Sequence, residues 1–159
     1  MKRIISLVLI ALTFAFCLAS CGQTESDAYE MKTPTTKSVA EAIKNSTEFE
    51  ELIELTSDNI TSRYFFDAET VEEFTVMVCS NAAIGDEIAI FKLKDKEKAS
   101  AMIDVVEMRK TDRMDALESY APDEKAKVEK GVIGRKGNYV YFIVAKDVEK
   151  AKEACENCF

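Results

Sequence analysis

The segment Gly85-Asp-Glu-Ile-Ala-Ile-Phe-Lys-Leu-Lys-Asp-Lys-Glu-Lys-Ala99 decides the fold, because it combines a strand with the start of a helix. Residues 87 to 93 are apolar, β-branched and aromatic, as in a buried strand, and the acidic residues that follow are typical of a helix start. A second apolar run, residues 74 to 80, precedes it across a turn-forming stretch. The pattern predicts an antiparallel strand pair followed by a helix from Asp95 to Tyr120.

The same order of features returns near the end of the chain. Residues 137 to 151 (GNYVYFIVAKDVEKA) repeat the Gly, Lys, Asp, Glu, Lys and Ala of residues 85 to 99 at matching positions. With Val132-Ile133 as a partner strand and a last helix from Asp147 to about Cys155, we expect two strand-strand-helix units. A shared strand-to-helix cap is the alternative explanation, because Lys-Asp before Glu-Lys-Ala is ordinary chemistry at a helix start.

The predicted class is therefore α+β. It is a four-stranded, mostly antiparallel sheet built from two strand-strand-helix units, with their helices on one face, plus an N-terminal helix at residues 38 to 55. Both faces of the strands are apolar, so the second face also needs a cover. The candidates are the N-terminal helix, the aromatic cluster Tyr64-Phe65-Phe66 and another protein, and we expect the helix. The cluster is expected to close the core, with a ligand pocket as the alternative.

The N-terminal segment has the pattern of a lipoprotein signal. Lys2 and Arg3 precede an apolar run from Ile4 to Leu18, and Leu18-Ala19-Ser20-Cys21 is a lipobox. A run of this length rises roughly 22 Å as a helix, less than the ~30 Å of a hydrocarbon core, which favours a signal over a transmembrane helix. A plain secretory signal is the other alternative. We expect cleavage between Ser20 and Cys21 and a diacylglyceryl group on the Cys21 thiol.

This signal sets the expected organisation and location of the protein. Residues 1 to 20 are the signal peptide, residues 21 to 37 a flexible tether, and residues 38 to 159 a single α+β domain. Cleavage takes Lys+Arg from 21 to 19 against 29 acids, a formal charge of −10. That charge argues against nucleic-acid partners. The expected partner is the membrane, through the lipid on Cys21, and the expected location is the extracytoplasmic face of the cell membrane.

The composition weakens the case for an enzyme. The chain has no histidine, which excludes Ser-His and Cys-His nucleophile pairs and imidazole metal sites. Cys155 and Cys158 have redox spacing, but they end the last predicted helix, whereas reactive pairs begin one. They are expected to be structural or incidental, with a local disulfide and a redox or metal role as alternatives. Cys79 is expected to be a small buried residue. We predict no catalytic, cofactor-binding or metal-binding residue.

Several stretches together resemble a known group of proteins. The lipobox, the strand Asp86 to Lys92, the helix around Arg109 that leads to Ser119-Tyr120-Ala121-Pro122, and Gly137-Asn138-Tyr139-Val140 carry the likeness. They resemble predicted lipoproteins of Gram-positive anaerobes that carry an uncharacterised domain of unknown function. The likeness covers about residues 38 to 155 and the signal. It implies no activity, substrate or cofactor, and the Cys155-x-x-Cys158 tail is not a feature of that group.

Two hypotheses about function follow. The first is a non-catalytic extracytoplasmic module that binds a small ligand or an envelope protein. It rests on the anchor, the tether, the absent histidine and the apolar second sheet face. The second is a surface enzyme or thiol-redox protein, which rests only on the abundant carboxylates and on Cys155 and Cys158. We favour the first.

Overall fold

One antiparallel sheet of five strands forms the centre of the domain, in the order β1-β2-β3-β5-β4. The computed structural model describes residues 33 to 159 of the chain. The strands are β1 (Leu52–Glu54), β2 (Val71–Cys79), β3 (Glu87–Leu93), β4 (Val132–Lys136) and β5 (Tyr139–Val144). β3 and β5 lie at the middle of the sheet, and every residue of both except Lys92 is buried.

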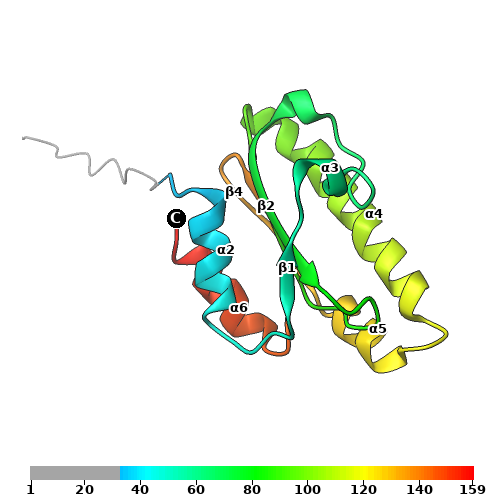
Figure 1. Ribbon diagram of the computed structural model, residues 1–159. Coiled ribbons are helices and arrows are strands. Elements are labelled where there is room, and N and C mark those ends of the chain that lie inside the picture. Colours follow the sequence, from blue (N-terminus) through cyan, green and yellow to red (C-terminus); the bar gives the residue numbers. More distant parts are fainter. Residues whose placement is uncertain (1–32) are drawn as a thin grey trace, which may run out of the picture. The chain divides into compact units, whose positions relative to one another are not determined.

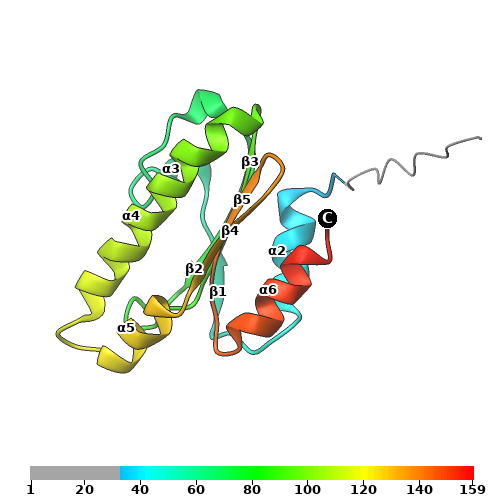
Figure 2. The same ribbon diagram turned by 180° about the vertical axis from the view of Figure 1, so that it is seen from behind.

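Helices cover both faces of this sheet, so the domain has three layers (Figures 1 and 2). α2 (Thr36–Lys44) and α6 (Val148–Glu156) pack side by side on one face, and α4 (Ala99–Leu117) crosses the other. The α4 face also carries α3 (Ser57–Ile60) and α5 (Pro122–Glu129), together with the short 3₁₀ turns η1 (Ala68–Thr70) and η2 (Lys96–Lys98).

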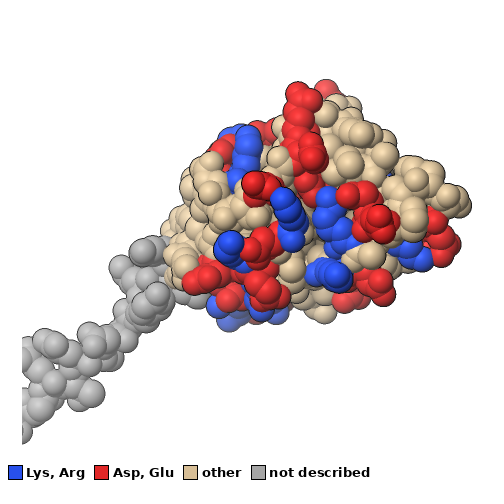
Figure 3. Space-filling view, turned by 90° about the horizontal axis from the view of Figure 1, so that it is seen from below, with Lys and Arg blue, Asp and Glu red and all other residues tan. Residues whose placement is uncertain are grey.

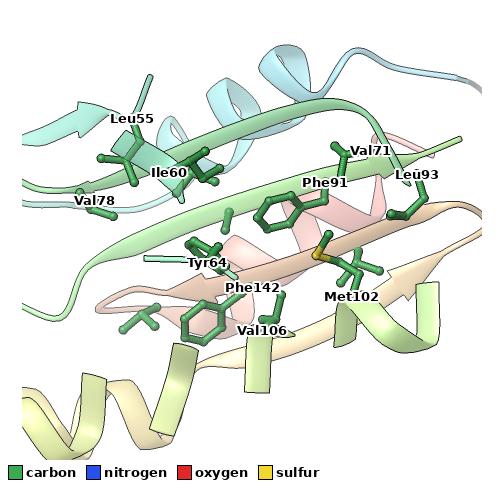
Figure 4. Packing of buried hydrophobic residues seen from close by; sticks show 14 of the residues in the cluster. Leu55, Ile60, Tyr64, Val71, Val78, Phe91, Leu93, Met102, Val106 and Phe142 are labelled. Atoms are coloured by element: carbon green, nitrogen blue, oxygen red, sulfur yellow. The ribbon is translucent and has the colours of Figure 1, made fainter. Parts of the chain in front are cut away.

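The core on the α4 face is the larger of two hydrophobic clusters. Phe91 and Phe142 project from the sheet toward Met102 and Val106 of α4, and Val78 joins the same cluster beside Leu55, as Figure 4 shows. Leu55, Ile60 and Tyr64 close its edge from the segment that links β1 to β2. Successive side chains of a strand point to opposite faces of the sheet. Ile88 and Ile90, which flank Ala89 and Phe91 in β3, therefore point away from α4.

The second cluster lies between the sheet and the pair α2 and α6. Ile88, Ile90 and Ile143 meet Ile43 of α2 and Cys155 of α6, and all five side chains are fully buried. This confirms that the N-terminal helix covers the second sheet face. Tyr141 is only 3 % exposed beneath α6, so it is not available as a contact position for another protein.

The strand number and the length of the first helix differ from the prediction. The sheet has five strands and not four, because residues 52 to 54, assigned to the N-terminal helix, form the edge strand β1 beside β2. α2 ends at Lys44 and is capped by Thr35, whose hydroxyl oxygen accepts from the Ser38 N–H at 3.1 Å. The weak helix formers Asn45-Ser46-Thr47 therefore end the helix.

The two strand-to-helix segments are not equivalent in the sheet. The expectation that both helices share one face is wrong, because α4 and α6 lie on opposite faces. Ile88 and Val140, which occupy matching positions of the two segments, also differ: Ile88 faces α2 and α6 while Val140 faces α4. What the segments share is the cap. Asp95 accepts from the Glu97 N–H and Asp147 from the Lys150 N–H. The residues that residues 85 to 99 share with residues 137 to 151 thus reflect a common way to start a helix after a strand.

A further helix was missed by the sequence pattern. α5 begins at Pro122, beyond the predicted end of the long helix at Tyr120, and it packs against α4. Pro at the first helical position, followed by two acids, is a favourable helix start that a mostly polar sequence concealed. The predicted signal, Ser20 and Cys21 lie outside the described residues. Within residues 33 to 159, no helix is long and apolar enough to cross a membrane.

Candidate functional site

A buried charged cluster stands at the start of β3, on the face that α4 covers. The Glu87 carboxylate accepts two hydrogen bonds from Arg109 of α4, at 3.1 Å from Nε and 2.9 Å from Nη2. The Tyr64 hydroxyl donates to Glu87 Oε1 at 2.6 Å. The exposed fractions are 1 % for Glu87, 8 % for Arg109 and 1 % for Tyr64. These three buried side chains therefore satisfy one another's hydrogen-bonding groups.

The electrostatics of the cluster follow from this geometry. Burial, and then the negative charge of Glu87, raise the pKa of Tyr64 well above its ordinary value, so the hydroxyl stays protonated as a donor. Burial opposes the charge on Arg109, but the Glu87 carboxylate outweighs burial and raises the guanidinium pKa. The Arg109 guanidinium also lies 5.7 Å from the centre of the Tyr64 ring. Arg109 is therefore a fixed cation.

A small recess opens beside this cluster, between α4 and the turn that joins β2 to β3. Its volume is about 60 Å³, and both Arg109 and Glu87 line it. Two further arginines line it as well, the exposed Arg63 after α3 and the half-buried Arg113, one turn beyond Arg109 on α4. Ile53 of β1, 45 % exposed, stands at its rim. The recess thus brings three guanidinium groups together.

The positive charge of the recess is only partly cancelled. Glu87 is paired with Arg109, and the second carboxylate, Asp86, accepts from Lys127 at 2.6 Å and from the Glu50 N–H at 2.9 Å. Both carboxylates therefore already have partners. Arg63 and Arg113 have no carboxylate partner among the described residues, on a chain whose formal charge is −8.

Arg113 is held in place by backbone groups and by the cations around it. Its Nη2 donates to the carbonyl oxygens of Ile84 at 3.0 Å and Ala82 at 3.2 Å, which fixes the β2–β3 turn against α4. Burial, and then the nearby charge of Arg109, lower the pKa of the Arg113 guanidinium. A further negative group in the recess would be stabilised by this pair of cations.

The other hollows are wide and open, and apart from the acidic one that Glu54, Glu72 and Glu73 line they are of mixed charge. The two at the end of the sheet near α5 and the start of α6 share Glu48 and Lys146, which pair at 2.6 Å. Figure 3 looks at the domain from below and shows lysine and arginine interspersed with aspartate and glutamate over that side. Among the described residues, no group of cysteine, aspartate and glutamate side chains is arranged to hold a metal ion.

The three cysteines of the described residues are buried or half-buried. Cys79 lines the recess from the end of β2, but by strand alternation it shares the face of Met77 and not that of Val78. It is buried, as expected of a strand cysteine. Cys155 is fully buried in α6, and burial raises the pKa of its thiol to about 12. The Cys158 thiol contacts the Ala154 carbonyl oxygen at 3.2 Å. No disulfide joins Cys155 to Cys158.

The aromatic cluster is divided between the core and the surface. Tyr64 and Phe66 pack edge-to-face on Phe91, with ring centres 5.2 Å and 5.6 Å apart, which confirms that the cluster closes the core. Phe65 is 71 % exposed.

The sequence pattern did not identify the residues of the recess. It predicted the long helix without assigning Arg109 to a buried face, and the structure buries Arg109, which follows Met102 and Val106 at helical spacing. An arginine at that spacing, together with a glutamate that begins an otherwise apolar strand, is the signal that could have revealed the pair.

The domain is thus an antiparallel sheet between two helical layers, with a buried Tyr-Glu-Arg cluster and an arginine-lined recess at one end of its central strands. The sequence model of a family described as a domain of unknown function, DUF4358, matches residues 45–145, and the chain belongs to this family. The matched range includes all the recess residues named above. No curated protein and no solved structure matched the chain.

Proposed function

We propose that this protein is a lipid-anchored, extracytoplasmic binding module. The lipobox ending at Cys21 supports the anchor, and the polar stretch up to residue 37 supports a tether between lipid and domain. Two acyl chains at about 0.8 kcal/mol per buried methylene would make such attachment lasting. The domain would then act on the outer side of the cell membrane.

The arginine-lined recess is the observation that carries the binding role. It offers fixed cations and hydrogen-bond donors, while its two carboxylates are already held by Arg109, Tyr64, Lys127 and a backbone N–H. Both carboxylates thus have their oxygens occupied by donors of the protein itself, and an arginine does not give up its proton near neutral pH. The recess is therefore suited to holding a ligand rather than to moving protons.

The geometry of the tail cysteines favours binding over thiol-redox chemistry. A reactive thiol needs exposure and a lowered pKa, as at a helix N-terminus. Cys155 is fully buried near the C-terminal end of α6, and the pKa of its thiol is raised. This supports the choice of a non-catalytic module over a redox protein.

Site-specific photo-cross-linking in intact cells tests the binding role. The full-length lipidated protein would carry a photoreactive amino acid at Ile53, on the rim of the recess, or at the exposed Glu153 of α6 as a matched control. We expect a discrete adduct from position 53 and none from position 153. Equal labelling at both positions, or turnover of a glycoside, ester or peptide substrate that is lost when Arg113 is replaced by glutamine, would overturn the proposal.

A further inference from the structure

We propose that the recess binds a carboxylate carried by a small ligand with an adjacent apolar group, an inference that rests on the proposed binding function. The guanidinium groups of Arg63 and Arg113 supply the charge, and Ile53, Val78 and Ile84 supply the apolar wall.

The size of the recess suits one small charged group. A volume of about 60 Å³ is room for a few water molecules or for one carboxylate with a short alkyl stem. Larger ligands would extend past the exposed Ile53 at the rim. The recess therefore recognises an end of a ligand rather than a whole large molecule.

The charge of the recess suits an anion. Arg63 and Arg113 remain unpaired by carboxylates after Glu87 and Asp86 are assigned to Arg109 and Lys127. Arg63 can present two parallel N–H donors, which match the two oxygens of a carboxylate, while Arg113, whose Nη2 already donates to two carbonyl oxygens, adds its charge and its remaining N–H groups. A ligand carboxylate would offset the burial of the Arg113 guanidinium and its repulsion by Arg109, the two causes that lower the pKa of Arg113 most.

The apolar wall favours a carboxylate over a phosphate as the ligand of the recess. A phosphate presents oxygens in every direction and would leave some of them against Ile53, Val78 and Ile84 without donors. A carboxylate presents its two oxygens on one side and an alkyl group on the other. The mixed lining of the recess matches the second shape.

The recess is also built before any ligand arrives. Arg109 is fixed by two hydrogen bonds to Glu87, and Arg113 by two backbone carbonyl groups. Only the exposed Arg63 has to become ordered on binding. Preorganised donors reduce the entropy lost when a ligand binds.

Titration calorimetry with small probes tests this inference. The full-length protein in detergent would be titrated at constant ionic strength with propionate, with propionamide as its neutral counterpart, and with inorganic phosphate. We expect binding of propionate, none of propionamide, and weaker binding of phosphate. Arg63→Gln should weaken propionate binding roughly tenfold or more, as expected for a lost hydrogen bond between charged groups. Lys44→Gln, which removes an exposed cation at the end of α2, should change it less than about twofold.

The outcomes separate the inference from the proposed function. Arg113→Lys, which keeps the charge but loses the hydrogen bonds that hold the guanidinium group to the β2–β3 turn, should weaken binding like Arg63→Gln. No binding of propionate, equal binding of propionamide, tighter binding of phosphate, or an unchanged affinity in Arg63→Gln would overturn the carboxylate assignment. If the cross-link at position 53 then persists in Arg63→Gln cells, the binding function stands and only the ligand class is wrong. If position 53 gives no specific cross-link in the protein that keeps Arg63, the binding function itself is overturned.

Discussion

Arg109 of α4 donates two hydrogen bonds to the carboxylate of Glu87 on β3, although the two residues lie 22 positions apart in the chain. The pair joins the central strand to the long helix in the interior of the domain, where both side chains are buried. A buried pair of this kind is costly to break, because removal of one partner leaves a charge without compensation.

Removal of one member of this pair should therefore destabilise the domain strongly. We expect Arg109→Met to lower the free energy of unfolding by about 3–5 kcal/mol, and Tyr64→Phe, which removes one hydroxyl donor, by about 1–2 kcal/mol. Urea denaturation followed by circular dichroism measures both. The double variant Glu87→Gln/Arg109→Met should be more stable than Arg109→Met alone, because it removes both charges. A loss of stability equal to the sum of the losses in Glu87→Gln and in Arg109→Met would contradict the coupling between the two residues.

The glycine in β4 should not tolerate a side chain. A Cβ at Gly134 would come within 2.3 Å of the Tyr141 hydroxyl oxygen, and the Tyr141 ring is buried under α6 with its hydroxyl 3.2 Å from Glu156. We expect Gly134→Ala to cost about 1–3 kcal/mol of stability, as overpacking does. Thermal unfolding measures it. Gly134→Ala/Tyr141→Leu is the control, because the smaller ring-free side chain leaves space and should restore most of the loss.

The Glu124 carboxylate should make stability depend on acid pH. Burial opposes its charge, but the Gly85 N–H at 2.7 Å and the Lys127 cation outweigh burial and lower its pKa. A carboxyl whose pKa is lower in the folded state stabilises the fold above its unfolded pKa of ~4.3, and that contribution is lost as the pH falls through the folded pKa. Glu124→Gln should therefore flatten the decline in stability below about pH 4.5. Urea midpoints at pH 3 to 6 measure this, with exposed Glu149→Gln as the control.

The Cys155 thiol should be almost inert in the folded protein. A thiol pKa of about 12 leaves very little thiolate at pH 8. Alkylation of Cys155 by iodoacetamide should be roughly 10³-fold slower in the folded than in the unfolded chain, as the raised pKa requires. Mass spectrometry of time points measures it. Replacement of Cys155 and Cys158 by serine should cost about 1–3 kcal/mol and leave insulin reduction at background, and a loss of measurable reductase activity would favour the redox hypothesis.

The proposed lipid anchor can be tested by substitution of one residue, Cys21. The Cys21 thiol is the proposed acyl acceptor, so Cys21→Ala should abolish incorporation of a labelled fatty acid and leave the precursor uncleaved by the lipoprotein peptidase. Cys79→Ala is the control and should keep the label. Label that persists in Cys21→Ala would remove the lipid anchor from the proposed function.

The elements with strong patterns were predictable from the sequence. The apolar runs of β2, β3 and β5 and the helix start after Asp95 follow from composition and capping, and two apolar sheet faces required a second helical layer. β1 was not predictable, because its three residues have no period of their own and form a strand only by pairing with β2. The faces taken by α4 and α6 depend on the packing of the whole sheet. The recess was also hidden, because Glu87, Arg63 and Arg113 meet only through tertiary contacts.

The chain enters the domain far from the recess. The Tyr139 hydroxyl donates to the Pro34 carbonyl at 2.7 Å, and Tyr139 pairs with Lys92 at the C-terminal end of β3, whereas Glu87 and the recess lie at the other end of that strand. The two ends are about 17 Å apart, at ~3.4 Å per residue. With the proposed lipid on Cys21, tension from the membrane would reach the domain at the end opposite the opening. Changes in tether length would then alter the height of the opening above the lipid surface, and leave its shape and its access from the surrounding solution as they are.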